Sequence, residues 1–253
     1  MQYIAISPEK HKSHAIFLRQ NFAFAKSQIT LPVVLDELSQ LLPTYPLAFV
    51  MREEKPELVA LVGDGTRNLF VGPQDLWIDH YVPAQLRAFP FSLIPTGDNK
   101  LTLCIEENHL TQDSDAPSIF NTDGSLSDKA NEFLEFLKSL EQSKNQTKSA
   151  VQKLVELHLL KPWSVDLPLT EDKVQKLTGL YCIDEQALND LEPVQFAQLR
   201  ATGSVALAYA QLFSMHNIKQ LTKRAKFLKE HNVDALEVDL EKLFGEDDDT
   251  FKF

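Results

Sequence analysis

Glycine and cysteine are both scarce in this sequence. Only 8 of its 253 residues are glycine, roughly half of the average usage of about 7 %. Glycine-rich loops that cradle phosphates are therefore disfavoured, and neither GxxxxGK(S/T) nor GxGxxG occurs. The two cysteines, Cys104 and Cys182, lie far apart and form no CxxC motif, which gives no support to a disulfide scaffold or a structural zinc site. Both lie in apolar, strand-like runs, where a reduced cysteine packs as a small hydrophobic residue.

Long apolar segments are also missing. The longest apolar stretch near a predicted helix, residues 205–213, is far shorter than the ~20 residues that a membrane-spanning helix needs. Residues 1–13 contain no apolar core of a secretory signal peptide. We therefore expect a soluble protein with no membrane span, located in the cytoplasm.

Positive charge is in deficit, with 25 Lys and Arg against 36 Asp and Glu, a net charge of −11. A nucleic-acid partner is not expected, because the phosphate backbone requires clustered cations. The 7 histidines show no HxH or HExxH spacing, and no GxSxG nucleophile motif occurs. We accordingly expect no metal site and no cofactor, identify no catalytic residue, and prefer the interpretation that the protein is not an enzyme.

Residues 1–125 are predicted to form a region rich in antiparallel sheet. Their strand-like runs are separated by turns or single short helices, which leave no room for the crossovers that parallel strands need. We expect short helices over 35–42 and 81–89, and a turn at Asp64-Gly65. The expected strands are 3–6, 47–51, 58–62, 68–71, 91–94 and 101–105.

Residues 126–233 are predicted to be mainly helical and to pack on that sheet, giving one composite α+β domain. Ser127 is a good N-cap for a long helix whose apolar stripe is interrupted by the polar segment 141–149, and we favour one continuous helix. Residues 234–253 form an acidic tail. The other expected elements are strands 163–169 and 180–183 and helices 193–201, 204–215 and 218–231, with Gly203 as a break.

Aromatic residues are concentrated in the first 91 residues, and most must belong to the core. Trp77, Asp79, Tyr81 and Arg87 combine amphipathic rings with charges near a loop, a composition suited to binding a ligand or a peptide. Tyr209 lies among apolar neighbours on a predicted helix and needs a partner for its hydroxyl. A pocket is expected where that helix meets residues 77–87; the alternative is that both segments pack in a common core with a structural ion pair.

Two acidic pairs occur in matching contexts. The pair Glu106 and Glu107 follows Cys104-Ile105, and the pair Asp184 and Glu185 follows Cys182-Ile183. A strand end followed by an acidic first helical turn explains this repeat, because carboxylates are favourable at helix N-termini. Alternatively, the two pairs converge on a cation or a basic partner.

Several local patterns occur in an order that a known family shares. They are Asn21-Phe22-Ala23-Phe24-Ala25, Tyr45-Pro46-Leu47-Ala48-Phe49, Asn68-Leu69-Phe70-Val71, Trp77 with Tyr81-Val82-Pro83-Ala84, Pro90-Phe91, the two acidic repeats and the stretch 199–214. With these patterns the chain resembles the bacterial SapC family from about residue 5 to about residue 222. Glu106 stands where that family more often has Asp.

The resemblance implies little about chemistry. The family's name derives from surface-layer proteins, and it has no established catalytic residue to carry over. Its members tend to be encoded near flavin-dependent halogenase-like proteins, so the resemblance suggests an accessory role and such a protein as partner. We therefore expect a non-catalytic binding or accessory protein that recognises a small ligand or a protein or peptide partner. The alternatives are an enzyme that uses the two acidic pairs and a secreted surface-layer component.

Overall fold

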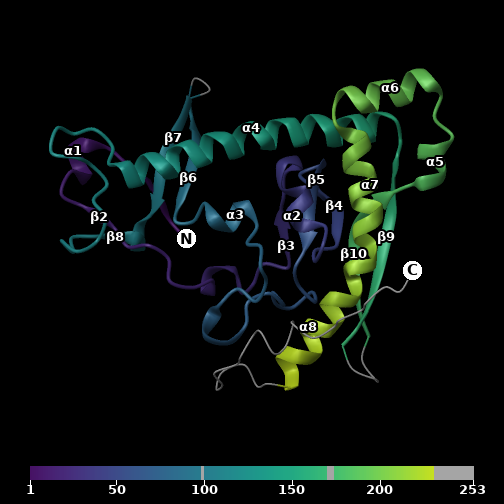
Figure 1. Cartoon of the computed structure of the whole chain (residues 1–253), viewed down its shortest axis with the longest axis horizontal. Helices are drawn as coiled ribbons and strands as arrows, with labels where there is room; N and C mark the ends of the chain where they lie inside the picture. Colours follow the sequence, from purple (N-terminus) through teal and green to yellow (C-terminus); the bar gives the residue numbers. More distant parts are fainter. Residues whose placement is uncertain (98–99, 170–173, 231–253) are drawn as a thin grey trace, which may run out of the picture.

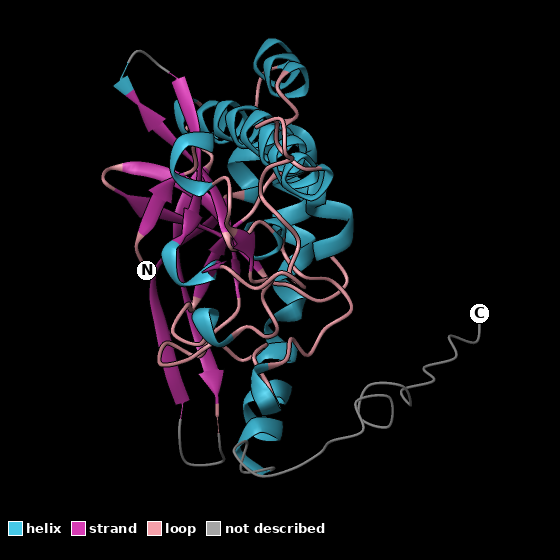
Figure 2. Ribbon diagram, turned by 90° about the vertical axis from the view of Figure 1, so that its left-hand side faces the viewer, coloured by secondary structure: helices cyan, strands magenta, loops and turns pink. Residues whose placement is uncertain are grey.

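Strands gather on one side of the molecule and most of the helices pack on the other (Figure 2). The computed structural model describes residues 1–97, 100–169 and 174–230, so the acidic tail 234–253 lies outside the described residues. Every strand pairing in the described part of the chain is antiparallel, and the α+β class expected from the sequence is confirmed.

The described strands form three sheets (Figure 1). The large sheet has five strands in the order β3 (Thr30–Pro32), β5 (Lys55–Leu61), β4 (Leu47–Arg52), β10 (Val174–Ile183), β9 (Leu160–Pro168). The small sheet has three strands in the order β1 (Tyr3–Ala5), β7 (Lys100–Glu106), β6 (Phe91–Thr96). The third is the short pair β2 (Ala15–Ile16) and β8 (Leu110–Thr111).

The helices differ greatly in length. The first three are single turns, whereas α4 has 29 residues and crosses the whole molecule (Figure 1). The helices are α1 (Pro8–His11), α2 (Leu38–Leu41), α3 (Ala84–Arg87), α4 (Asp128–Glu156), α5 (Glu185–Asn189), α6 (Pro193–Ala201), α7 (Ser204–Ser214) and α8 (Ile218–Glu230). A left-handed Gly203, with φ of 76°, separates α6 from α7 as expected.

The strands expected at 163–169 and 180–183 are present in β9 and β10, which complete the large sheet. Two expectations need correction. The helix expected over 81–89 is only α3, since Pro83 restricts the residue before it to extended backbone. Residues 68–71 form isolated bridges and no strand, because the Asn68 side chain bonds the backbone of Phe70 and Ala25 and competes with strand pairing.

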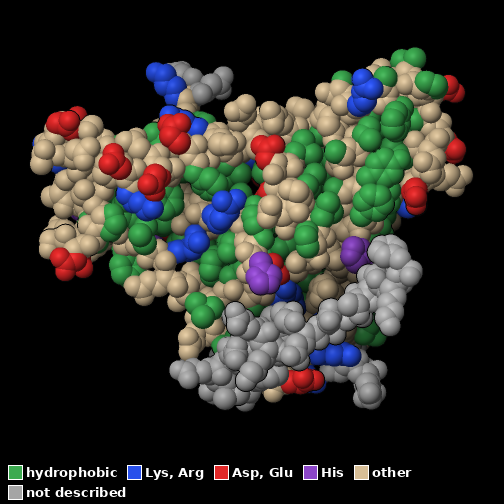
Figure 3. Space-filling view, in the orientation of Figure 1, with side chains coloured by type: hydrophobic (Ala, Val, Ile, Leu, Met, Phe, Trp, Pro, Cys, Tyr) green, Lys and Arg blue, Asp and Glu red, His purple; other side chains and the backbone are tan. Residues whose placement is uncertain are grey.

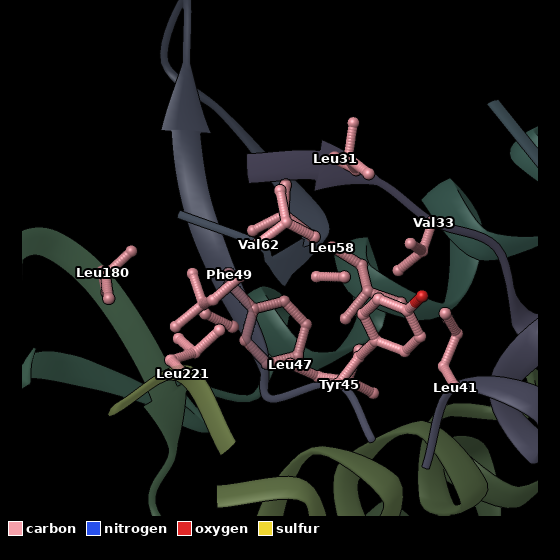
Figure 4. Close-up of a cluster of buried hydrophobic side chains, with 14 of the residues drawn as sticks. Leu31, Val33, Leu41, Tyr45, Leu47, Phe49, Leu58, Val62, Leu180 and Leu221 are labelled. Carbon is pink, nitrogen blue, oxygen red and sulfur yellow. The ribbon is translucent and has the colours of Figure 1, made fainter. Parts of the chain in front are cut away.

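Two separate cores lie along α4. Its first half contributes Ala130, Leu137 and Leu140 to the small-sheet core, which also contains the β6 and β7 side chains. Its second half contributes Ala150, Val151 and Leu154 to the large-sheet core. Figure 4 shows part of the large-sheet core, where the labelled side chains are Leu31, Val33, Leu41, Tyr45, Leu47, Phe49, Leu58, Val62, Leu180 and Leu221.

The polar segment 141–149 is the part of α4 that passes between these two cores. The segment is continuous helix, as predicted. Ser127 caps the start of α4 by accepting a hydrogen bond from the Ala130 N–H at 3.2 Å. Thr147 is buried, donates to the Ser143 carbonyl at 2.7 Å and accepts from the Leu35 N–H at 2.9 Å. The segment therefore crosses the gap while fixing the turn that begins at Leu35.

Proline occurs in three of the four strands that end the two main sheets. β3 ends in Pro32, β6 contains Pro95, and β9 contains Pro162 and Pro168. Because proline has no N–H, each of these positions lacks one donor for strand pairing. The fourth such strand, β1, has three residues.

The hairpin between β4 and β5 turns on two glutamates in left-handed backbone. Glu53 has φ of 48° and Glu54 has φ of 63°, the pattern of a type I′ turn that favours Asn-Gly. A non-glycine residue in this region costs roughly 1–2 kcal/mol. Arg52 pairs with Lys55 across the turn, so both side chains leave the same face of the hairpin.

Replacing Glu53→Asn and Glu54→Gly should stabilise the protein, because both residues tolerate left-handed backbone. We expect the free energy of unfolding to rise by about 1 kcal/mol, and Tm in thermal denaturation to rise by about 2–4 °C. As a matched control, Glu132→Gly on the exposed side of α4 should lower stability by about 1 kcal/mol, since helical backbone disfavours glycine. A fall in Tm for the turn variant would contradict the conclusion that Glu53 and Glu54 are strained.

Candidate functional site

Trp77 faces the large-sheet core and not an open cleft. Its side chain is 8 % exposed, and its ring stacks on Phe70 with 5.4 Å between ring centroids. The indole N–H lies 3.1 Å from both the Tyr45 hydroxyl and the Tyr81 carbonyl, so one donor is shared between two acceptors. The Tyr45 hydroxyl in turn donates to the same Tyr81 carbonyl at 2.5 Å. Trp77 thus fixes the backbone of the segment that follows it.

Asp79 forms a buried ion pair with Arg224 of α8. Their charged atoms are 2.5 Å apart, and each side chain is 6 % exposed. Arg224 also donates to the Ile78 carbonyl, and its guanidinium carbon lies 4.1 Å from the centroid of the Phe70 ring. Burial lowers the pKa of Arg224, and the Asp79 carboxylate opposes this change. The pair anchors α8 to residues 77–79.

Tyr81 is held by Glu37, a buried carboxylate that the sequence analysis did not identify. The Tyr81 hydroxyl donates to Glu37 at 2.9 Å, and burial together with the Glu37 charge raises the pKa of Tyr81 to about 12. Glu37 also accepts hydrogen bonds from the N–H groups of Val34 and Ala84. Its place at the third position of a helical start, where a carboxylate can bond back to the cap, is the signal that would have found it.

Arg87 connects α3 to α4. Its guanidinium donates to the Tyr81 hydroxyl at 3.1 Å and to the Val82 carbonyl at 3.0 Å. The same group lies 5.0 Å from the centroid of the Phe136 ring of α4. Unlike Trp77 and Asp79, Arg87 is exposed at the surface.

Tyr209 takes no part in these hydrogen bonds within the described part of the chain. Its ring stacks on Phe213, which is 66 % exposed, and hydrophobic side chains gather along this face of α7 (Figure 3). The helix that reaches residues 77–79 is α8, through Arg224, and not the α7 helix that carries Tyr209. Trp77 lies in the large-sheet core and Tyr81 and Tyr209 pack against it, so a pocket between the two segments stays a prediction.

The two acidic pairs lie in different sheets (Figure 1). Glu106 ends β7 and accepts from the Asn108 N–H and from His109, and these hydrogen bonds outweigh the effect of burial and lower the pKa of Glu106. Asp184 directly follows β10, caps α5 through the Ala187 N–H and pairs with Lys161 at 3.3 Å. Glu107 and Glu185 begin the helical turns that follow. Each pair is thus a strand end with an acidic first turn.

The described residues contain no group of three or more His, Cys, Asp and Glu side chains that could hold a metal ion. In the same part of the chain, no helix is both long enough and apolar enough to span a membrane.

A cleft of about 320 Å³ lies beside the polar segment of α4, and we call it the basic cleft. Its walls come from α4, the β4–β5 hairpin, the end of β3 and the start of α3. It is lined by Pro32, Val33, Val34, Arg52, Lys55, Pro56, Glu57, Leu58, Gln85, Leu140, Lys144, Asn145, Thr147, Lys148 and Val151. Prolines and aliphatic side chains form much of this surface, and the charges come from the hairpin and the helix.

Two of the four cations that line the basic cleft are paired. Arg52 contacts Glu57 at 2.6 Å, and Lys144 contacts Glu141 one turn earlier at 2.6 Å. A neighbouring carboxylate thus balances the charge of each of these two cations.

The other two cations, Lys55 and Lys148, have no carboxylate partner among the described residues. Lys55 reaches the basic cleft from the hairpin and Lys148 from α4, so unmatched positive charge stands on two walls. An anionic group between these walls would be attracted from both sides.

A smaller hollow of about 90 Å³ adjoins the basic cleft, and we call it the aromatic hollow. Gln85, Leu140 and Lys144 line both. The other residues of the aromatic hollow are Met1, Tyr3, Phe24, Gln28, Leu86, Ala88, Phe89, Phe91, Ser92, Leu93, Leu137 and Glu141. None of the sequence-predicted site residues lines either cavity. The residues that line the two cavities could not be predicted from the sequence, because nothing local shows which strand and which helix will face each other.

The Asp79–Arg224 pair should be structural. Arg224→Met or Asp79→Leu alone is expected to lower the free energy of unfolding by about 3–5 kcal/mol, because each change leaves one charge buried without its partner. The double variant should lose less than the sum of the two, as chemical denaturation would show. The exposed pair of Lys26 and Asp75 is the control, and Lys26→Met should cost less than about 1 kcal/mol. If Arg224→Met and Asp79→Leu each lowered the free energy of unfolding by less than about 1 kcal/mol, the pair would not anchor α8.

Comparison with known proteins gives one family. The sequence model of the SapC family matches residues 6–221, which cover most of the chain and include all of α4 and all the residues that line the basic cleft. No curated protein and no solved structure matches the chain. The match confirms the resemblance seen in the local sequence patterns, and the chain belongs to the SapC family.

Proposed function

We propose that this protein is a non-catalytic binding protein whose ligand is an anion with an apolar body, seated in the basic cleft. One observation carries the proposal: a chain with a net charge of −11 gathers four cations and one carboxylate around a single cleft of the described structure. A cleft lined by positive charge raises the local concentration of anions, so an anion is the ligand that it suits.

The size and lining of the basic cleft agree with this ligand. Its volume of about 320 Å³ falls in the range of roughly 300–1,000 Å³ that small-molecule sites occupy. Val33, Leu58, Leu140 and Val151 offer apolar surface at its base, while the lysines stand at the exposed rim. Apolar contacts would then supply affinity, and the lysines would select the charge.

The geometry favours binding over carboxylate catalysis. Glu106 and Asp184 each cap a following turn, Glu106 at the end of β7 in the small sheet and Asp184 just after β10 of the large sheet. Paired-acid hydrolysis needs two carboxyl groups within roughly 10 Å of each other. The single carboxylate of the basic cleft, Glu57, is in an ion pair with Arg52.

Partner and location belong to the same proposal. A flavin-dependent halogenase-like protein, which the family resemblance suggests, is the partner we propose, and its co-purification with a tagged chain from the native host tests this. The proposed location is the cytoplasm of a bacterial cell. Recovery of the protein on the cell surface, with none in the cytosolic fraction, would favour the surface-layer alternative.

Anilinonaphthalene sulfonate, an aromatic sulfonate whose fluorescence rises on binding, is a suitable probe. We expect the double variant Lys55→Glu, Lys148→Glu to weaken its Kd at least tenfold, because two attractive charges become repulsive. Uncharged phenylnaphthylamine should bind both proteins equally, since it has the same aromatic body without the sulfonate. Raising the salt concentration should weaken the binding of the sulfonate and not that of phenylnaphthylamine.

The matched control is Lys129→Glu, Lys138→Glu. It makes the same change in net charge with two lysines of α4 that line neither cavity. Each of them is in an ion pair, Lys129 with Glu132 and Lys138 with Glu135. This variant should keep the wild-type Kd for the sulfonate. Equal Kd values for all three proteins would overturn the assignment of the basic cleft, and equal loss in both variants would show that net charge alone governs binding.

A further inference from the structure

The basic cleft and the aromatic hollow lie next to each other along α4, and we call the two together the groove. They share Gln85, Leu140 and Lys144 in their linings. On α4 the lining residues run from Leu137 to Val151. At a rise of 1.5 Å per residue, this stretch of helix is about 21 Å long.

A groove of this length suits an extended chain better than a compact molecule. A peptide in extended conformation advances about 3.3 Å per residue, so roughly six residues would span the stretch. The small hollow alone is too small for a drug-sized ligand, but about 90 Å³ accommodates one or two side chains of a chain that continues into the basic cleft.

The two ends of the groove differ in chemistry. The basic cleft offers Lys55 and Lys148 to carboxylates, as described above. The aromatic hollow is lined by the rings of Phe24, Phe89 and Phe91, of which only Phe24 is partly exposed. Acidic groups of a ligand would therefore bind in the basic cleft, and apolar groups of the same ligand would bind in the aromatic hollow.

Amide side chains line the aromatic hollow. The side-chain amides of Gln28 and Gln85 have no hydrogen-bond partner among the described residues, although each carries two donors and an acceptor. Peptide backbone has the complementary donors and acceptors at every residue. A fatty acid, which has none along its chain, would leave these amide groups unused.

We infer that the groove binds an extended peptide segment of a partner protein, with acidic side chains in the basic cleft and apolar or aromatic side chains in the aromatic hollow. This inference rests on the proposed function and names the class of its ligand. The recognition is through side-chain pockets and amide groups along a helix, and the charge of the basic cleft fixes which end of the peptide lies where.

The test uses the full chain and the capped hexapeptide Asp-Glu-Gly-Val-Leu-Phe, offered also in reverse order, in isothermal titration calorimetry. We expect one order to bind at least tenfold more tightly than its capped acidic half, Asp-Glu-Gly, because only the hexapeptide reaches the aromatic hollow. Gln28→Trp, which fills that hollow, should remove the tenfold gain and leave the acidic half unaffected. Gln20→Trp, at an exposed position outside the groove, is the matched control and should retain the gain.

The outcomes separate this inference from the proposed function. If the hexapeptide binds no more tightly than its acidic half while the sulfonate probe still depends on Lys55 and Lys148, the peptide is wrong and the anion site stands. If dodecanoate binds more tightly than either hexapeptide and Gln28→Trp abolishes its binding, the ligand is lipid-like and the inference is overturned. If neither the binding of the sulfonate nor the binding of the peptide depends on Lys55 and Lys148, the proposed function is overturned as well.

Discussion

Helix α4 has to bury apolar side chains in two cores at once, and the rest of the molecule is arranged around this requirement. Its two halves pack into the small-sheet core and the large-sheet core, so its middle must cross the gap between them. A helix can do so because its backbone hydrogen bonds are internal, whatever surrounds its side chains. The gap is bridged and not filled, which leaves room for the basic cleft beside residues 141–149.

The charge of the basic cleft comes from two elements that are distant in sequence. The hairpin supplies Lys55 from a turn in costly left-handed backbone, and α4 supplies Lys148 from its polar segment. Holding like charges near one another lowers stability unless an anion lies between them. Strain and charge thus coincide at one place, and natural proteins tolerate such costs where a site needs them.

The sequence was sufficient where signals are local. The N-cap at Ser127, the continuity of 141–149, the helix 193–201 and the break at Gly203 each follow from neighbouring residues, and the structure has all of them. It was insufficient where two distant elements must be matched. Several helices carry similar apolar stripes, so nothing local shows that α8 and not α7 reaches Ile78 and Asp79. The basic cleft was missed for the same reason, because its lysines are unremarkable until the hairpin and α4 face each other.

The prolines at the sheet margins have a consequence for how this protein can meet other chains. A strand added to β3, β6 or β9 would lack a hydrogen bond wherever proline stands, and β1 is too short to serve as a template. Growth of the sheets from molecule to molecule, the first step of cross-β aggregation, is therefore disfavoured at every margin of the two main sheets. The same prolines leave crevices and helix surfaces as the means of recognition, so a partner segment can be held reversibly without becoming part of a sheet.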